Sequence, residues 1–322
     1  MTTAPLYDPD RASYDAATEA HIARLLVGAI DPHVHTGPSI ANRALDHIEY
    51  ARDCSKAGFA AIITKDHDYS SVMTSWLINK HNPELKTKVY GSIVLNNVIG
   101  GLNPYAVEHT AAMGGKVCWL PTLTAENHFR WEKASGWVHP ASTTKIRPAT
   151  VVKIMTENGE VRDDVKEIID ICVKNDMAMA SGHLHISETW KVFELAKKRG
   201  MTRMVVTHPE EIVDASLNDV KGLASLGAMI EHSNCMFLDG CKFQHAKAED
   251  LIKHIQAAGV DNTMFASDLG QVGKGCFHPH EAFRRSIKIC LDAGYSDADI
   301  TKMVSLNAAR VLGIPLEAPK AA

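Results

Sequence analysis

Residues 29–38 read Ala-Ile-Asp-Pro-His-Val-His-Thr-Gly-Pro and directly follow the apolar run Leu-Leu-Val-Gly at residues 25–28. They predict a β-strand that ends in two imidazoles. Because residues i and i+2 of a strand point to the same face, His33 and His35 project together while Val34 packs on the other side. Two neutral imidazoles on one rigid strand favour binding of a transition-metal cation. For an isolated His-x-His the alternative is a pair of solvated or core histidines, so the rest of the sequence has to decide.

The length and charge of the chain indicate one large domain. Its 322 residues exceed the usual size of a single hydrophobic core, ~250 to 300 residues, but one α/β barrel with insertions accommodates them. We therefore predict a single domain over residues 1–322, with its core at about 25–315. Lys and Arg number 34 against 38 Asp and Glu, giving a formal net charge of −4 without a basic block. Nucleic acid and anionic membrane surfaces are therefore not expected as partners.

Cysteine usage and the N-terminal sequence indicate a compartment. Seven cysteines are scattered along the chain and form no Cys-x-x-Cys motif. An odd number without such a motif argues against a disulfide framework or a thiolate zinc site, and is typical of a reducing compartment. The N-terminal sequence MTTAPLYDPDRASYD lacks the charged and then apolar segments of a signal peptide. Since the sequence also has no apolar run of ~18 residues, we expect a cytoplasmic protein.

Apolar strands alternate with amphipathic helices along most of the chain. The strands are near-continuous hydrophobic runs, such as residues 59–64, which is typical of parallel strands buried on both faces. Eight such strands in strict alternation with helices predict an α/β fold of the (β/α)8 TIM-barrel class. An open doubly wound sheet is disfavoured, because no Gly-x-Gly-x-x-Gly follows the first strand. After the strand around His33, we expect strands at 59–64, 89–95, 116–121, 177–182, 204–207, 228–231 and 263–267, and helices at 43–57, 70–79, 104–113, 164–174, 187–199, 217–226, 248–258, 280–293 and 297–311.

Two segments lie outside this alternation. Residues 1–24 form an N-terminal extension, with a helix expected at 10–26 that caps the barrel floor or a partner subunit in a homo-oligomer. Residues 122–161 form a long insertion after strand four, and the dipeptide Asn158-Gly159 within it favours a hairpin. Loops of this length are uncommon unless functional, so we predict a lid, with decoration of the fold as the alternative. The insertion carries Glu126, His128, Arg130, Trp131, Trp137, Lys145 and Arg147.

Polar side chains recur at the carboxyl ends of the predicted strands. In an eight-stranded barrel these ends form one rim around one mouth, where such barrels carry their chemistry. A single polar residue there would be explained as a hydrogen-bonded core residue, but packing alone does not favour imidazoles over Val and Leu at so many strand ends. We therefore predict one site built from His33 and His35 (strand one), Lys65 and His67 (two), His183 and His185 (five), His208 (six) and Asp268 (eight).

In these motifs the chain resembles the amidohydrolase superfamily of metal-dependent hydrolases over nearly the whole barrel. The resemblance rests on Asp-Pro-His-Val-His at the first strand, Ser-Gly-His at the fifth, Val-Thr-His-Pro at the sixth, Ala-Ser-Asp at the eighth, and the closing helix at 305–313. It implies that His33, His35 and Asp268 bind a buried divalent metal ion, and that His183 and His208 bind a more exposed one. Histidine and carboxylate ligands make zinc the expected metal, with manganese or iron as alternatives.

The ligand that bridges two ions is where the chain departs from this superfamily. Relatives commonly supply a carboxylated Lys or a Glu from strand four, whereas residues 117–122 read Val-Cys-Trp-Leu-Pro-Thr. We predict that Lys65 takes this place, because a lysine desolvated beside cations has a lowered pKa and its free amine can take up carbon dioxide. The alternatives are Glu126 of the insertion, a site with a single ion, or an uncarboxylated Lys65 that binds substrate.

The resemblance also implies a mechanism. Divalent ions lower the pKa of a bound water toward ~7, which provides hydroxide at neutral pH. Asp268 would take the proton of that water and deliver it to the leaving group, as general base and then acid. His67, His185 and Glu231 are candidates to stabilise the oxyanion or to orient the ligands. In the insertion, Arg130 suits an anionic substituent of the substrate, with a solvated basic surface as the alternative.

The expected reaction is hydrolysis of an amide, cyclic amides included, in a small polar and anionic molecule. Esters and lactones need the same machinery and stay open as substrates. A phosphoesterase is a second interpretation, in which Glu126, His67 and His232 add ligands for a third ion. A metal-dependent decarboxylase is a third interpretation. The non-enzymatic alternative is a barrel that binds a metal or a small ligand without turnover.

Overall fold

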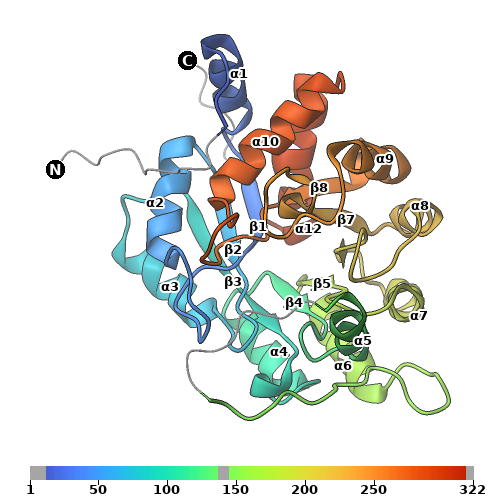
Figure 1. Cartoon of the computed structure of the whole chain (residues 1–322). Coiled ribbons are helices and arrows are strands. Elements are labelled where there is room, and N and C mark those ends of the chain that lie inside the picture. Colours follow the sequence, from blue (N-terminus) through green and yellow to red (C-terminus); the bar gives the residue numbers. More distant parts are fainter. Residues whose placement is uncertain (1–11, 137–144, 317–322) are drawn as a thin grey trace.

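Eight parallel strands form one sheet in the order β1-β2-β3-β4-β5-β6-β7-β8, with helices around it (Figure 1). The structure is a computed structural model that describes residues 12–136 and 145–316. It confirms the predicted (β/α)8 TIM barrel, with a strand at each of the expected hydrophobic runs. The strands are β1 (Ile30–Val34), β2 (Ala61–Thr64), β3 (Lys88–Val94), β4 (Val117–Trp119), β5 (Ala178–Ala180), β6 (Met204–Thr207), β7 (Met229–Ser233) and β8 (Thr263–Ala266).

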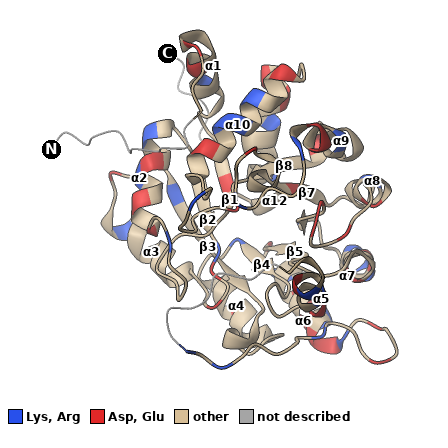
Figure 2. Ribbon diagram, viewed as in Figure 1, with Lys and Arg blue, Asp and Glu red and all other residues tan. Residues whose placement is uncertain are grey.

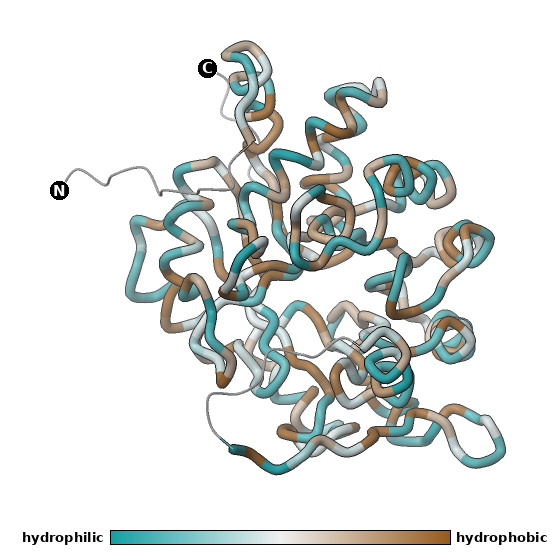
Figure 3. The backbone as a smooth tube through the Cα atoms, in the orientation of Figure 1, coloured by the Kyte–Doolittle hydropathy of each residue, from teal (hydrophilic) through white to brown (hydrophobic). Residues whose placement is uncertain are grey.

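The helices form the outer layer, and along most of them hydrophobic and hydrophilic residues alternate (Figure 3). Local capping sets where several begin: the Asp46 carboxylate accepts from the Glu49 amide, and the Glu49 carboxylate accepts from the Asp46 amide. The helices are α1 (Ala16–Leu25), α2 (His47–Ala57), α3 (Val72–His81), η1 (Asn97–Ile99), α4 (Pro104–Ala112), α5 (Glu126–Ser135), α6 (Asp163–Lys174), α7 (Ile186–Lys198), α8 (Leu217–Leu226), η2 (Asn234–Phe237), α9 (Ala248–Ala258), η3 (Val260–Asn262), α10 (Pro279–Asp292), α11 (Asp297–Thr301), the π-helical η4 (Lys302–Leu306) and α12 (Asn307–Leu312).

The seam between β8 and β1 is joined at the carboxyl end of the two strands. The Asp268 amide donates to the His33 carbonyl at 2.9 Å, and the His35 amide donates to the Leu269 carbonyl at 2.8 Å. Below them, the buried Asp31 carboxylate accepts from the Ser267 amide at 3.1 Å and from the Ser267 hydroxyl at 2.6 Å. These bonds fix the end of β8 against the His-x-His strand, so they set the position of Asp268 relative to both histidines.

The floor of the barrel is closed by α12. Side chains of α12, among them Ala308 and Leu312, pack against the inward-facing Ile30 and Ile63 in one buried apolar cluster. The Asn307 amide group donates to the Thr263 carbonyl at 2.7 Å, at the start of β8. The N-terminal helix therefore does not cap the floor within the described residues.

The N-terminal helix instead packs on the outside of the barrel. Expected at 10–26, it begins at Ala16 because the Asp15 carboxylate caps it by accepting from the Ala17 and Thr18 amides. Its Glu19 pairs with Arg284 of α10 at 2.5 Å. Residues 1–11 lie outside the described part of the chain.

The insertion at 122–161 contains a helix, which we did not predict. This helix, α5, covers Glu126–Ser135. The hairpin expected at Asn158-Gly159 is present as a turn. A single antiparallel bridge between Met155 and Val161 closes this turn. Trp137 and the rest of residues 137–144 lie outside the described residues.

Two other element boundaries differ from expectation. The helix expected from residue 43 begins at His47, because the chain before it pairs with the segment after β8: Arg43 bridges Gln271, and the Ala44 amide donates to the Gly270 carbonyl at 2.8 Å. The final helix, expected at 297–311, is divided by the π-helical turn η4.

Lys and Arg are interspersed with Asp and Glu over the outer helices (Figure 2). Among the described residues, no helix has the length and hydropathy needed to cross a membrane.

Candidate metal centre

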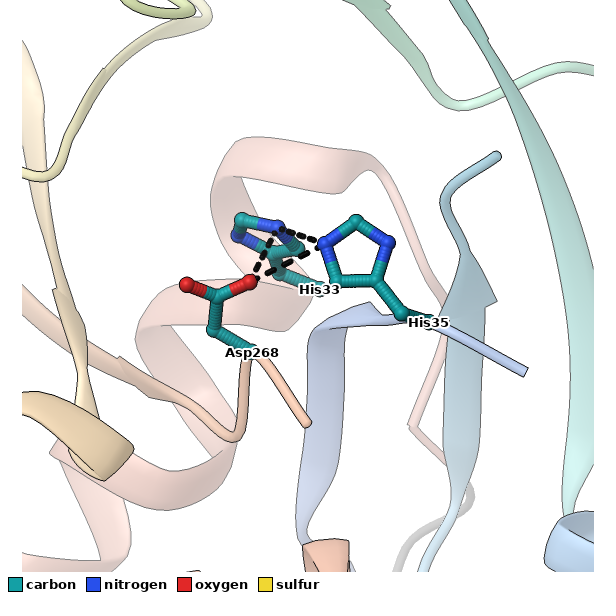
Figure 4. A group of neighbouring side chains, drawn as sticks. All are labelled: His33, His35 and Asp268. Atoms are coloured by element: carbon teal, nitrogen blue, oxygen red, sulfur yellow. Dashed lines mark hydrogen bonds and ion pairs between the residues drawn. The ribbon is translucent and has the colours of Figure 1, made fainter. Parts of the chain in front are cut away.

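His33, His35 and Asp268 converge at the carboxyl ends of β1 and β8 (Figure 4). The Asp268 Oδ1 atom lies 3.0 Å from the Nε2 atom of His33 and 3.0 Å from that of His35. The two Nε2 atoms are 3.2 Å apart. Ligand atoms around a tetrahedral zinc ion with bonds of ~2.0–2.1 Å are separated by about 3.3 Å, so these three atoms have the spacing of ligands to one ion.

Partners on the far side of each ring orient the two imidazoles. His33 Nδ1 donates to the Oε1 atom of the fully buried Glu231 at 2.7 Å. His35 Nδ1 donates to the Lys65 carbonyl at 3.0 Å. With both Nδ1 atoms protonated, both Nε2 atoms present lone pairs toward Asp268, which is the tautomer that binds metal. Glu231, predicted as a residue that orients the ligands, thus contacts His33 directly.

Lys65 lies beside this trio. Its Nζ atom is 2.9 Å from His33 Nε2 and 4.4 Å from the centre of the Trp119 ring. Burial lowers the pKa of the Lys65 ammonium to about 8, against the opposing attraction of Asp268 and Glu231. An amine with this pKa is partly neutral near neutral pH. Carboxylation by carbon dioxide and proton exchange both require this neutral form.

His183 and His208 face the trio from β5 and β6. Their ring centres are 5.1 Å apart, and His208 is 5.4 Å from the His33 ring. Ser233 of β7 hydrogen-bonds His208 Nδ1 at 3.0 Å. Burial holds the pKa of His35, His183 and His208 well below the usual value, so these imidazoles are neutral and can ligate.

A further imidazole, His128, joins this group from the insertion. Its Nδ1 atom lies 2.9 Å from His183 Nδ1, and its ring is buried. Asn127 anchors this part of α5, because its side-chain amide donates to the carbonyls of His183 at 3.1 Å and Ile212 at 2.6 Å. We did not predict His128 as a site residue. Its only signal in the sequence was a histidine in the long insertion that follows strand four.

The donors fit one or two divalent ions. Burial raises the pKa of the Asp268 carboxyl, but the contacts with His33 and His35 outweigh burial and hold this pKa well below its usual range. Together with His35, Lys65, His183 and His208, Asp268 lines a cavity of about 70 Å³. Imidazoles and an ionised carboxylate are donors that zinc-like ions prefer.

The backbone at the site is in an uncommon conformation. Asp268 has φ of 52° and His208 has φ of 53°, in the left-handed region. Non-glycine residues there cost about 1–3 kcal/mol, and such residues cluster at functional sites. Gly270 cannot be replaced, because a Cβ there would lie 1.9 Å from the His35 carbonyl oxygen. Gly182 is equally constrained, with a Cβ that would lie 2.2 Å from the Leu120 carbonyl oxygen.

The other predicted site residues divide into two groups. His67 is brought in: its ring stacks on His35 at 4.7 Å, and its Nδ1 atom hydrogen-bonds Thr122 at 3.0 Å. His185 does not join the site, because it caps α7, where its Nδ1 atom accepts a hydrogen bond from the Ser187 amide at 3.2 Å. Glu126 and Arg130 are exposed on α5 and do not line the cavity. The placement of Glu126 disfavours it as a bridging ligand.

The insertion covers part of the mouth. Trp131 of α5 lines the cavity, and its Nε1 atom donates to Glu211 at 2.8 Å in the segment after β6. A larger hollow of about 890 Å³ adjoins the cavity at His67. Its walls include residues 146–153 of the insertion and Arg43.

Comparison with known proteins gives one family. Residues 28–231 match the model of a family described as "Family of unknown function (DUF6282)". The matched stretch includes His33, His35, Lys65, His183 and His208 and ends before Asp268. No curated protein matches the chain.

Solved structures with the same fold include several hydrolases. An amidohydrolase from Pseudomonas aeruginosa has 12% sequence identity and a TM-score of 0.61, over 92% of this chain and 98% of that one. The probable dipeptidase PvdM from Pseudomonas aeruginosa has 11% identity and a TM-score of 0.62, over 93% and 98%. An organophosphorus hydrolase mutant from Deinococcus radiodurans has 13% identity and a TM-score of 0.55, over 90% and 94%. At these identities the likeness concerns the fold, and at that level it confirms the resemblance to amidohydrolase barrels.

Proposed function

We propose that this chain, which belongs to the DUF6282 family of unknown function, is a metal-dependent hydrolase that cleaves an amide bond, open-chain or cyclic, in a small anionic molecule. The observation that carries the proposal is the convergence of two oriented Nε2 atoms and one carboxylate oxygen within 3.0 to 3.2 Å at the barrel mouth. A structural hydrogen-bond network would not need neutral imidazoles, a lysine of lowered pKa and left-handed backbone at the same place.

The proposed ligands are His33, His35 and Asp268 for one ion, and His183 and His208 for a second, with zinc as the expected metal. When bound, such ions polarise a carbonyl group and lower the pKa of a water molecule. Lys65 is proposed to bridge the two positions after carboxylation. Its Nζ atom, 2.9 Å from His33 Nε2, supports this role.

Asp268 is the proposed proton carrier. Its Oδ1 atom contacts both histidines of β1, whereas Oδ2 lies 3.7 Å from His208 Nδ1 and 4.0 Å from Cys235 Sγ. Oδ1 therefore faces the position that it would share with the two Nε2 atoms as a metal ligand, while Oδ2 has longer contacts and is available to accept a proton from water and return it to the leaving nitrogen. Trp131, which lines the cavity, excludes water from this region and so strengthens the electrostatic contacts within it.

An anionic substrate is proposed from the charges of the larger hollow. Four cationic side chains line it, Arg43, Arg147, Lys153 and Arg162, against two carboxylates, Asp68 and Asp164. Arg162 is paired with Asp164 at 2.7 Å, which leaves an excess of positive charge. His67 lines both this hollow and the cavity of the metal centre, so the two spaces adjoin.

Arg43 is the cation best placed to bind the substrate. Its Nε–H is buried and has no hydrogen-bond partner among the described residues, and its Nη2 group reaches only Ser39 at 3.4 Å. Burial lowers the pKa of the guanidinium, although Asp66, Asp68 and Asp268 oppose the shift. A guanidinium stays charged in proteins, so a carboxylate that supplies the missing acceptor would be bound strongly.

Replacing Arg43 with Gln should raise KM for an anionic amide by ~10- to 100-fold, the equivalent of ~1.5–3 kcal/mol for one charge-assisted hydrogen bond. The value of kcat should change much less, because the metal ligands are untouched. Steady-state kinetics on a matched pair of anionic and neutral substrates would measure the effect, with Arg52→Gln as a control at an exposed position of α2 that does not line the hollow. An equal KM increase for both substrates would show that Arg43 does not bind the anionic group.

The proposed function is tested by removing and restoring the metal. Dialysis against a chelator should lower kcat on N-acyl amino acids or cyclic amides by ~10²-fold or more, and zinc, manganese or cobalt should restore it. Elemental analysis of the same samples gives the bound equivalents. Ester and lactone isosteres in the same panel distinguish the bond types. If they are hydrolysed faster than the amides, the proposed substrate is an ester or lactone and not an amide. If the metal-loaded protein hydrolyses none of these substrates, the proposed function is wrong.

A further inference from the structure

A second cluster of potential metal ligands lies on the outside of the barrel wall. Side chains of β7 alternate between the two faces of the sheet. Glu231 and Ser233 point inward, since they contact His33 and His208 of the metal centre. His232, between them, points outward, where its ring lies 5.7 Å from the ring of His254 on α9. The outward cluster is therefore separated from the metal centre by the sheet itself.

Three residues from three segments form this outer cluster. One ligand atom each of Glu210, His232 and His254 lie within 4.8 Å of one another. Glu210 follows β6, and its Oε1 atom contacts His232 Nδ1. Its side chain is 2% exposed, and that of His232 is fully buried. Phe237 forms one wall, with its ring 6.2 Å from His232 and 6.4 Å from His254.

Each of the three residues carries a buried polar atom without a hydrogen-bond partner among the described residues. These atoms are Glu210 Oε2, His232 Nε2 and His254 Nδ1. An unsatisfied buried polar atom costs about 1–3 kcal/mol, so three in one cluster would be a large penalty for a native fold. A bound species that all three contact would remove that penalty.

We propose that Glu210, His232 and His254 bind a divalent transition metal, with zinc as the leading candidate, at a structural site separate from the candidate metal centre. Two imidazoles and one carboxylate are the ligand set that zinc prefers. The charge also favours a cation over a water molecule. The Glu210 carboxylate is only 2% exposed and needs a positive partner, whereas a water molecule would complete hydrogen bonds without supplying charge.

The site would connect three elements of the barrel wall. His254 belongs to α9, His232 to β7, and Glu210 to the segment between β6 and α8. That segment also holds His208 and Glu211, the acceptor of the Trp131 indole. A metal at Glu210 would thus fix the backbone on which His208 is placed, so the outer site is a positioning device for the inner one.

Metal content of matched variants tests the proposal. Wild-type protein should bind about one equivalent more zinc than His254→Gln, and that difference should persist in a His33→Ala, His35→Ala background, which lacks two of the three inner ligands. His109→Gln, at an exposed histidine on α4, is the control and should bind as much zinc as wild type. Because the two inner ligands are replaced separately, loss of the inner site and loss of the outer site give different results.

Anomalous scattering at the zinc edge, from crystals of zinc-loaded wild type, tests the same site without any variant. A peak is expected between Glu210, His232 and His254. The proposal is overturned if His254→Gln binds as much zinc as wild type, or if the cluster shows a water molecule with no anomalous signal. Should His254→Gln fail to fold, Glu210→Gln and the anomalous map decide the question.

Discussion

Asp268→Asn should lower kcat by at least ~10²-fold while most of the metal stays bound. The amide keeps the shape of the side chain and one oxygen at the position of Oδ1, 3.0 Å from both histidines, but it cannot accept and return a proton. Asn also tolerates the left-handed φ of 52° at this position, so the backbone should not change. Steady-state kinetics together with elemental analysis of the same preparation would measure both effects.

A matched control for this variant is Asp214→Asn. Asp214 also has a left-handed backbone, with φ of 60°, but its side chain is 84% exposed and does not line the cavity. Its kinetics should equal those of wild type. If Asp268→Asn loses activity and metal together, Asp268 acts mainly as a ligand. If it keeps metal and retains kcat within ~3-fold of wild type, the assignment of the proton carrier is wrong.

Lys65→Ala should lower activity by roughly 10²-fold or more and remove metal, chiefly the more exposed ion. The Nζ atom lies 2.9 Å from His33 Nε2, and a carboxylated side chain would place an anion between two cations there. Without that anion the two ions repel each other. Metal analysis and kinetics measure the loss, and Lys174→Ala is the control, because Lys174 lies on α6 with its side chain 76% exposed and lines neither the cavity nor the larger hollow.

Carboxylation itself has a direct test. Formate or acetate in solution should restore part of the activity of Lys65→Ala by occupying the vacated position. In wild type, ¹³C-labelled bicarbonate should give a carbamate resonance that Lys65→Ala lacks. Full metal retention in Lys65→Ala, with activity lost and no rescue, would instead identify Lys65 as a cation that binds substrate. Glu126 is a weak alternative as the bridge, because it is exposed on α5.

The sequence determined the barrel and the positions of most residues of its inner rim. Near-continuous apolar runs alternating with amphipathic helices specify parallel strands with helical crossovers, and eight of them close a sheet. The strand period of two then places His33 and His35 on one face, and parallel order brings His183, His208 and Asp268 to the same end. These are local or topological properties, so they could be predicted without knowledge of any side-chain contact.

Only the tertiary structure decided which polar residues act together. His128 reaches His183 because α5 folds back over the mouth, where Asn127 binds two carbonyl groups of distant segments. Arg43 enters the hollow because its segment pairs with the chain after β8 instead of starting a helix.

The same reason explains the placement of two histidines that local sequence does not determine. His185 follows a strand end like its neighbour His183, yet the start of α7 uses it as a cap. His232 alternates with Glu231 on β7, and only the packing of α9 shows that it meets His254 and Glu210. Strand direction and the side-chain period of a strand can be predicted from the local sequence. The partner of a side chain depends on segments tens to hundreds of residues away, whose approach is set by the packing of the whole barrel.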